Sequence, residues 1–275
     1  MSSRISQRFQ ALERENRTGL VAYIMASDPD HETCLEILKG LPAAGADVIE
    51  LGFPFTDPMA DGPSIQKAAL RALKAGGSLK QTLELARRFR EHDKDTPLIL
   101  MGYANPIEQM GYDAFAQKIA SSGADGAIIV DLPPEEDAPL RAAFAPHGLS
   151  IIRLATPTTD DRRLTKVLDG ASGFLYYVAV AGVTGAATAA AQDVNNAVQR
   201  LKLATKLPIA VGFGVRTPEA AAATARVADA VVVGSAFVDE IAAGGKSQAV
   251  ERVLRKVAQL SEAVRQARAK EGTPA

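Results

Sequence analysis

The stretch GADVIE, from Gly45 to Glu50, places two small residues and an aspartate in front of a short apolar run. The same kind of phrase recurs as GADGAII from Gly123 and, more loosely, as VADAVVV from Val227. A phrase that recurs in front of three predicted strands indicates a repeated structural unit.

Working outward from these phrases, we find short runs rich in Val, Ile and Leu separated by stretches of helical period. Most of the runs are apolar at consecutive positions, as in strands that are covered on both faces. The eight runs are Leu20 to Met25, Asp47 to Leu51, Leu98 to Tyr103, Ala127 to Asp131, Ser150 to Leu154, Phe174 to Val178, Ile209 to Gly212 and Ala230 to Val233. Their alternation with helices predicts repeated β-α units around a parallel sheet.

Several helices have recognisable first residues, which are capping residues or prolines. They are His31 to Leu41 after Asp28-Pro29, Leu79 to His92 after Ser78, and Pro218 to Val227 after Thr217. Ile5, Phe9 and Leu12, at helical spacing, predict an extra N-terminal helix on the barrel floor.

The interval from Leu51 to Leu98 is longer than one β-α unit needs. It has room for an extended loop, FPFTDPMADGP, and for two helices, one from Ser64 to Ala75 and one from Ser78. We therefore expect an additional helix after the second strand, and we expect the inserted loop to be functional.

Together these elements predict an α/β protein, a single (β/α)8 TIM barrel formed by residues 1–268, with a frayed tail at 269–275. The alternative is a doubly wound open sheet, which also alternates strand and helix. No G-x-G-x-x-G follows the first strand, so a dinucleotide-binding fold gains no support.

Composition narrows the class of protein. The 275 residues carry 31 Lys plus Arg against 32 Asp plus Glu, a net charge of -1, which does not favour nucleic acid or anionic lipid as a partner. The N-terminus has no apolar signal segment, which predicts a cytoplasmic protein. Cys34 is the one cysteine, and three scattered histidines offer no metal-ligand spacing, so we expect no metal site.

Two acids stand where a barrel builds its active site, at the carboxyl ends of strands. Glu50 ends an apolar run, where burial should raise its pKa into the range of a general acid or base. Asp61 lies in the loop that follows and could take a separate role. The alternative for Glu50 is a structural hydrogen bond to a backbone amide. Asp57 is a third acid in this loop, but its place before Pro58 equally suits a residue that forms a turn.

Glycines follow three later strands in AGVTGA (181–186), GFGV (212–215) and GSA (234–236). Backbone amides beside glycine and a helix N-terminus can bind phosphate without a lysine. The absence of a strand lysine disfavours Schiff-base chemistry. Tyr103 and Tyr176 could contact an aromatic ligand or fill the barrel rim, and Arg153 could be a site residue or an outward side chain.

The run from Glu50 to Gln66, ELGFPFTDPMADGPSIQ, closely resembles the signature of the tryptophan synthase alpha chain family. The likeness extends through YIMASDP near Tyr23, LMGYANPI from Leu100, YYVAVAGVTG from Tyr176 and VGFGVRTPE. The resemblance implies a barrel that cleaves indole-3-glycerol phosphate to indole and glyceraldehyde 3-phosphate.

The resemblance also implies the role of each matched residue. Glu50 is the acid and base, and Asp61 stabilises the charge at the indole nitrogen. Tyr103, Tyr176 and Thr184 contact the indole and glycerol parts of the substrate. The phosphate-binding positions are Gly185, Gly214, Gly234 and Ser235.

A partner follows from the resemblance as well: a beta chain that carries pyridoxal phosphate in an alpha2-beta2 complex, with no cofactor in this chain. Pro54, Asp57 and Pro58 are turn residues that we expect to be exposed and to contact it. The segment from Ala179 to Ala191, rich in Gly and small residues, is expected to close over the phosphate and to be poorly ordered without ligand.

Some positions depart from the family pattern. Thr56 replaces the usual Ser and Ser64 the usual Thr, and Ser27 stands where a glycine is expected. Val180 and Ala181 replace residues that are often polar. The sequence is also compatible with two other functions: that of a different phosphosugar enzyme such as an isomerase, and that of a catalytically idle barrel that serves as a regulatory partner.

Overall fold

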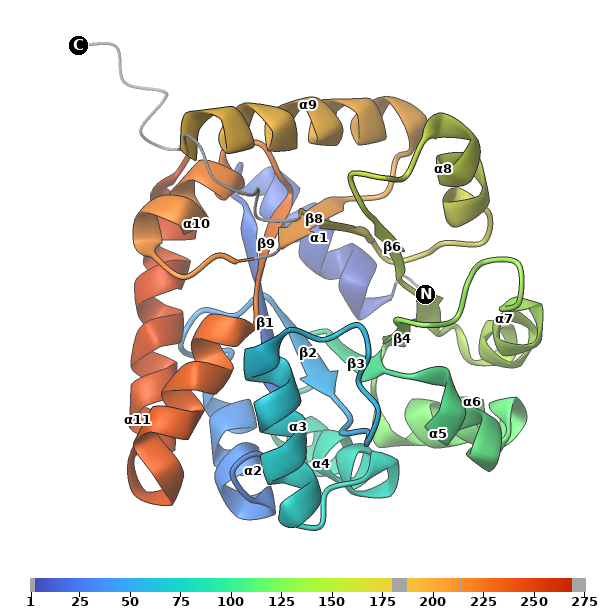
Figure 1. Ribbon diagram of the computed structural model, residues 1–275, viewed down its shortest axis with the longest axis vertical. Coiled ribbons are helices and arrows are strands. Elements are labelled where there is room, and N and C mark those ends of the chain that lie inside the picture. The colour runs from blue at the N-terminus through green and yellow to red at the C-terminus, as the bar shows by residue number, and fades with distance from the viewer. Residues whose placement is uncertain (1–2, 180–186, 213, 269–275) are drawn as a thin grey trace.

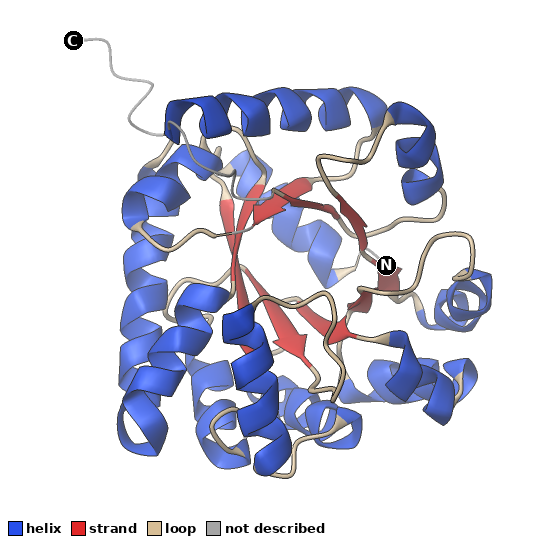
Figure 2. Cartoon of the chain, in the orientation of Figure 1, coloured by secondary structure: helices blue, strands red, loops and turns tan. Residues whose placement is uncertain are grey.

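The computed structural model describes residues 3–179, 187–212 and 214–268. It has nine parallel strands in one sheet, in the order β5-β4-β3-β2-β1-β9-β8-β7-β6, with helices around them (Figures 1 and 2). The strands are β1 (Gly19–Met25), β2 (Val48–Gly52), β3 (Leu98–Gly102), β4 (Gly126–Ile129), β5 (Ser150–Ile151), β6 (Arg153–Ala155), β7 (Leu175–Val178), β8 (Ile209–Gly212) and β9 (Ala230–Val233). The predicted TIM barrel is confirmed.

The fifth predicted strand differs from the expectation, because it is divided in two at Ile152. Its first half, β5, pairs with β4, and its second half, β6, pairs with β7. Ile152 still donates its N–H to the carbonyl of Ala127 at 3.0 Å. This one stretch of chain therefore joins the two ends of the sheet and closes the barrel, which is why eight predicted strands become nine.

The helices lie outside the strands, with one exception at the floor. They are α1 (Arg4–Arg14), α2 (His31–Gly40), α3 (Pro63–Lys74), α4 (Leu79–His92), α5 (Ala104–Met110), α6 (Tyr112–Ser122), α7 (Ala138–Phe144), the short 3-10 helix η1 (Ala145–His147), α8 (Asp161–Leu168), α9 (Ala187–Ala204), α10 (Pro218–Ala225) and α11 (Ser235–Gln266), which is kinked at Gly245. Ser78 and Thr217 cap α4 and α10 with their side chains. The predicted pair of helices between β2 and β3 is present as α3 and α4.

The exception is α1, which is seen through the ring of strands in Figure 1. It buries Ile5, Phe9 and Leu12 among inward-facing residues of the strands, and the rings of Phe9 and Phe174 lie 5.7 Å apart. The predicted N-terminal helix on the barrel floor is confirmed. Apolar burial there removes the amino-terminal end of the barrel from water.

The repeated sequence phrase has a structural counterpart on this floor. Each aspartate of the phrase directly precedes a strand. Its carboxylate accepts a 2.9 Å hydrogen bond from a backbone N–H at the start of the neighbouring strand that comes earlier in the chain. The three pairs are Asp47 with Leu20, Asp125 with Leu98 and Asp229 with Ile209. Each aspartate also meets a cation, so the repeated unit is a charged clasp between neighbouring strands.

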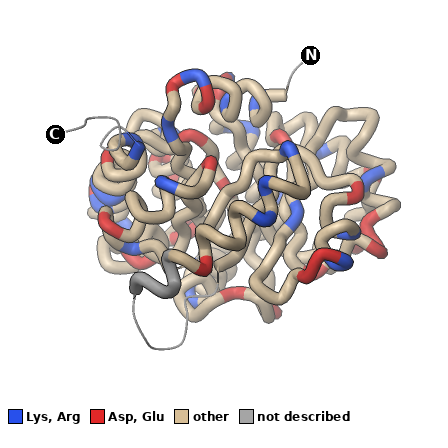
Figure 3. The backbone as a smooth tube through the Cα atoms, turned by 90° about the horizontal axis from the view of Figure 1, so that it is seen from above, with Lys and Arg blue, Asp and Glu red and all other residues tan. Residues whose placement is uncertain are grey.

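Charge on the molecule is mixed. Figure 3 shows Lys, Arg, Asp and Glu intermingled along the chain rather than gathered by sign. Over residues 3–179, 187–212 and 214–268, no helix has both the length and the apolar character needed to cross a membrane.

Candidate active site

Alternation along β2 decides where its acid points. Val48 packs in the barrel interior, whereas Ile49 and Leu51 pack outward against the helices. Because successive side chains of a strand face opposite sides, Glu50 and Gly52 face the interior. Glu50 therefore lies inside the barrel, above the floor and close to the carboxyl end of its strand.

Glu50 carries a buried carboxyl group to which no described residue donates a hydrogen bond. Its side chain has no exposed surface, and neither carboxyl oxygen has a hydrogen-bond partner among the described residues. Burial penalises the charged form and raises the pKa of Glu50 to about 8. The alternative of a carboxylate bonded to a backbone amide is wrong for this structure.

Asp61 lies in the loop between β2 and α3, on the same side of the barrel. The Tyr103 hydroxyl hydrogen-bonds its carboxylate and also accepts the N–H of Ala60 at 3.1 Å. Burial raises the pKa of Asp61 to about 6, against the opposing effect of the Tyr103 hydrogen bond. The two predicted acids thus have separate pKa values, one above and one below neutrality, as separate roles require.

The loop is held from its far end by α3. Arg71 of that helix donates two hydrogen bonds of 2.8 Å to Asp28, which is buried beyond the end of β1. Just before it, Ser27 has a φ of 66°, in the left-handed region that favours glycine. The departure from the family pattern at Ser27 therefore falls on a conformation that suits the expected glycine better.

Two tyrosines complete the interior around Glu50. Tyr176 packs against the interior cluster from β7, as the sequence analysis allowed. Tyr23 of β1, which was not predicted as a site residue, is paired in register with Glu50 and is 6% exposed. The signal that could have found it is its place in YIMASDP, at an inward position of the strand beside Glu50.

The mouth of the barrel is the end at which the strands have their carboxyl ends, and its side opposite Asp61 carries the glycines. Gly214 has a φ of 72°, and Gly234 precedes the first turn of α11 with no side-chain cap. Ser235 begins that helix, so N–H groups and the positive end of its dipole are available to an anion. Thr184 and Gly185, and with them most of the expected closing segment, lie outside the described residues.

The predicted contact loop is only partly exposed. Asp57 is exposed and bonds the Thr56 hydroxyl, and Pro58 is half-buried. Pro54 is buried, contrary to the expectation that all three would be exposed. The reason is packing: a side chain at Gly77 would lie 3.1 Å from the Pro54 ring, which rests against the end of α3.

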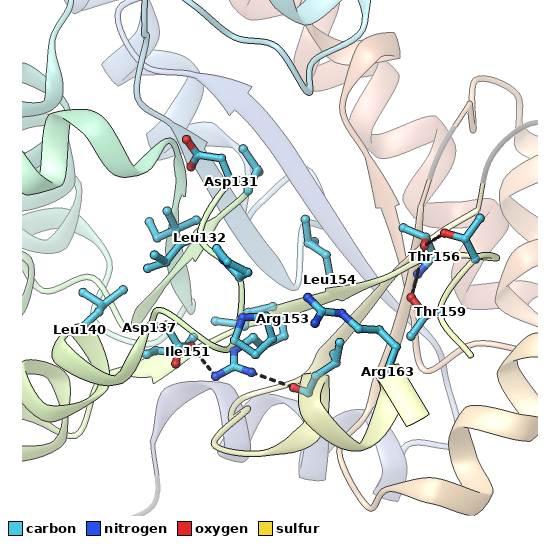
Figure 4. A pocket seen from close by; sticks show the side chains of 17 residues that line it. Asp131, Leu132, Asp137, Leu140, Ile151, Arg153, Leu154, Thr156, Thr159 and Arg163 are labelled. Carbon is cyan, nitrogen blue, oxygen red and sulfur yellow. Dashed lines mark hydrogen bonds and ion pairs between the residues drawn. The ribbon is translucent and has the colours of Figure 1, made fainter. Parts of the chain in front are cut away.

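A cavity of about 560 Å3 lies beside the mouth, between the ends of β4 and β6 (Figure 4). Its lining includes neither Glu50 nor Asp61. Arg153 lines it from the outward face of β6, and its guanidinium pairs with the Asp137 carboxylate and the carbonyl of Val167. This settles the question left open by the sequence: Arg153 points outward, away from the barrel interior.

Metal ligands are not gathered in the described part of the chain. No group of three or more His, Cys, Asp or Glu side chains there has the arrangement that holds an ion. What the structure does gather is a pair of acids with raised pKa values opposite an uncapped helix N-terminus. That set can move a proton, stabilise a positive charge and hold an anionic group.

Comparison with known proteins identifies relatives along nearly the whole chain. The family described as "Tryptophan synthase alpha chain" matches residues 9–267. The tryptophan synthase alpha chain of Caulobacter sp. (strain K31) is 60% identical over 267 residues, covering 96% of this chain and 97% of the relative.

Solved structures agree with this. The tryptophan synthase alpha subunit of Legionella pneumophila str. Paris superposes with a TM-score of 0.90 at 40% identity, covering 96% of this chain and 99% of that one. A chain of Mycobacterium tuberculosis tryptophan synthase superposes with a TM-score of 0.87 at 33% identity, with the same two coverages.

Proposed function

The chain belongs to the tryptophan synthase alpha chain family, and from this premise we propose that Glu50 and Asp61 are its catalytic residues. The enzyme is a lyase that cleaves indole-3-glycerol phosphate to indole and glyceraldehyde 3-phosphate in tryptophan biosynthesis. A single observation carries the assignment of Glu50: a buried, unpartnered carboxyl group whose pKa is raised to about 8. Membership of this family favours the lyase over the two alternative functions, a different phosphosugar isomerase and a catalytically idle barrel.

The reaction breaks the bond between C3 of indole and the first carbon of the glycerol side chain. Glu50 gives its proton to C3, so that indole departs neutral. It then takes the proton of the hydroxyl on the neighbouring carbon, which becomes the aldehyde. A pKa of about 8 keeps Glu50 protonated at neutral pH, which supports its starting as the acid.

Asp61 has the complementary task. Protonation of C3 places positive charge on the indole nitrogen, and an anion beside its N–H stabilises that charge. With a pKa of about 6, Asp61 is mostly ionised at neutral pH, and the Tyr103 hydroxyl holds its carboxylate. The opposite pKa positions of the two acids support the opposite roles.

The remaining residues bind the substrate in this proposal. Gly185, Gly214, Gly234 and Ser235 hold the phosphate, and α11 supplies its N-terminus. Tyr103, Tyr176 and Thr184 contact the indole and glycerol parts. Inward-facing Tyr176 and the mouth position of Tyr103 support this placement.

An alpha chain has a beta chain as its partner, and we propose an assembly of two alpha and two beta chains. Exposed Asp57 and half-buried Pro58 supply the contact, with Pro54 supporting the loop from beneath. We propose that pyridoxal phosphate serves only the beta chain. A cytoplasmic location and a single domain at residues 1–268 also remain proposals.

The test is indole release from indole-3-glycerol phosphate by the purified chain, with and without its beta chain. We expect a slow isolated chain that the beta chain accelerates, and an Asp57→Ala variant that responds less. Asp169→Ala, an exposed acid on the floor side, serves as the matched control.

The outcomes separate the proposals. An isolated chain already at full rate, indifferent to the beta chain and to Asp57→Ala, would remove the coupling and leave the lyase standing. Activity lost on exhaustive chelation and restored by a divalent ion would contradict the metal-free mechanism.

A further inference from the structure

Tyr23, a buried residue of β1, has no part in the proposed reaction steps. On β1, Val21 faces the barrel interior, while Ala22 and Ile24 pack outward. Tyr23 therefore faces inward, and the register of the two strands places it directly beside Glu50. Tyr176, the other inward tyrosine, comes from β7, which is not a neighbour of β2 in the sheet.

Two glycines mark where the Tyr23 side chain runs. A Cβ at Gly52 would lie 2.3 Å from the Tyr23 hydroxyl, far inside contact distance. A Cβ at Gly234 would lie 3.3 Å from the other end of the ring. The hydroxyl thus rests over the strand that carries Glu50, two residues closer to the mouth, and the ring separates this strand from the helix that begins at Ser235.

The surroundings of Glu50 offer few groups that could stabilise its charge. Tyr23 from β1 and Tyr176 from β7 interact electrostatically with Glu50, and Tyr23 in turn interacts with Asp61, Tyr103 and Asp28. The neighbouring strand β3 presents Ile99 and Met101, and β9 presents Val232. In the described part of the chain none of these neighbours is a cation.

A proton-transferring carboxyl group needs a donor once it has lost its proton. Burial and the nearby carboxylates raise the pKa of Tyr23 well above its ordinary value, so its hydroxyl keeps its hydrogen across the working range. A hydrogen bond to a charged acceptor is among the stronger ones in proteins. A tyrosine beside Glu50 can supply it without giving up its own proton.

We propose that Tyr23 is a positioning residue of the lyase reaction, whose hydroxyl donates a hydrogen bond to the Glu50 carboxylate after Glu50 has protonated indole C3. The proposal rests on the proposed function and deepens it. The proton balance is unchanged: C3 receives the Glu50 proton, Glu50 receives the proton of the glycerol hydroxyl, and Tyr23 keeps its own. The ring also fixes the gap between Glu50 and the phosphate side of the site.

The test is Tyr23→Phe in the full chain, assayed for indole release from pH 5 to 10. We expect kcat to fall roughly tenfold or more, with KM changed by less than about threefold, because the donor serves a charge that appears only during the reaction. The alkaline limb of kcat/KM should move up by about one pH unit, since Glu50 loses a donor to its charged form.

Tyr177→Phe is the matched control. Its residue is 4% exposed against 6% for Tyr23, but it packs outward from β7 against helices. This variant should keep the parental kcat and the parental alkaline limb. Thermal unfolding of both variants shows whether either has lost its fold.

The results divide cleanly. An active parent with a Tyr23→Phe variant of equal kcat and unmoved limb would overturn this inference alone. A lower kcat with an unmoved limb would also overturn it, because the hydroxyl would then act on something other than Glu50. A parent that releases no indole would instead refute the proposed function.

Discussion

Two buried acids at opposite ends of the barrel, Asp125 on the floor and Glu50 toward the mouth, have opposite surroundings. On the floor, Asp125 accepts a hydrogen bond from the N–H of Leu98 and pairs with Arg4 at 2.6 Å and Arg90 at 3.2 Å. At the mouth, Glu50 is more deeply buried, yet neither of its oxygens has a partner in the described chain. Asp125 directly precedes β4 and Glu50 lies within β2, but of the two only Asp125 is paired with cations.

The difference teaches which acids serve stability and which serve chemistry. A buried charge with cations and N–H donors around it locks neighbouring strands together, and losing a partner is costly. A buried acid without partners is held in its neutral form and is ready to give up a proton. We infer that the floor was built for rigidity and that the mouth keeps an uncompensated group for proton transfer.

The largest expected effect comes from Glu50→Gln. The amide keeps the shape of the side chain but cannot transfer a proton, so kcat for indole release should fall about 10³-fold. Binding of a phosphate ligand, measured by calorimetry, should survive. Glu262→Gln, on the outer helix α11, is the control. Activity within tenfold of the parent would sink the assignment.

The same acid-to-amide change should have opposite effects on stability at the two ends. Asp125→Asn removes the nearer of two carboxylates that pair with buried Arg90, leaving Asp93 at 3.7 Å, and should cost about 3 kcal/mol. Glu50 has a folded pKa of about 8, raised from an unfolded value of 4.5, so its contribution to stability is present below pH 4.5 and is lost as pH rises toward 8. Glu50→Gln removes that loss and should add about 3 kcal/mol at pH 7.

Urea unfolding of both variants at pH 5 and pH 8 measures this contrast. The advantage of Glu50→Gln should grow with pH, whereas the cost of Asp125→Asn should be present at both values. If both variants were less stable than the parent at pH 8, the Glu50 carboxylate would have to be stabilised by a partner. The contrast between Glu50 and Asp125 would then be contradicted.

Asp61→Asn sharpens the comparison within the mouth. It removes the negative charge beside the indole nitrogen, and kcat should fall about 10²-fold. The acid limb of the pH profile near 6 should vanish with it, since that limb reports Asp61. A raised KM with an intact kcat would make Asp61 a uniform-binding residue instead.

Ser27→Gly should have the smallest effect. Ser27 sits at a φ of 66° beyond β1, on the mouth side, where glycine is unstrained. The substitution should stabilise the fold by about 0.5 kcal/mol, the relief of strain being offset in part by the freer unfolded chain. Thermal melting checks it, and a lower midpoint would mean that the Ser27 side chain contributes more than its backbone costs.

The barrel could be predicted from the sequence because strands that are covered on both faces appear in it as continuous apolar runs. The floor aspartates were visible as a repeated phrase, but their clasp was not, since it joins residues such as Asp229 and Ile209 through the sheet order. The break at Ile152 was invisible for the same reason. It depends on which neighbours the strand meets, and local pattern does not contain them.

At the site, the acids Glu50 and Asp61 stand in one local motif and could be predicted from it. Tyr23 was missed because its role depends on register with another strand and on space left by Gly52. The burial of Pro54 was also missed, because turn chemistry predicts a bend in the chain but not what packs against it.

The measurement that tests the central claim most directly is the pKa of Glu50 itself. Carbon-13 labelling of glutamate carboxyl groups, with Glu50→Gln to assign the resonance, follows its titration in the folded protein. We predict a midpoint near pH 8, set by burial without a charge partner. A midpoint near 4.5, the ordinary value for glutamate, would contradict the claim that the mouth keeps an uncompensated acid.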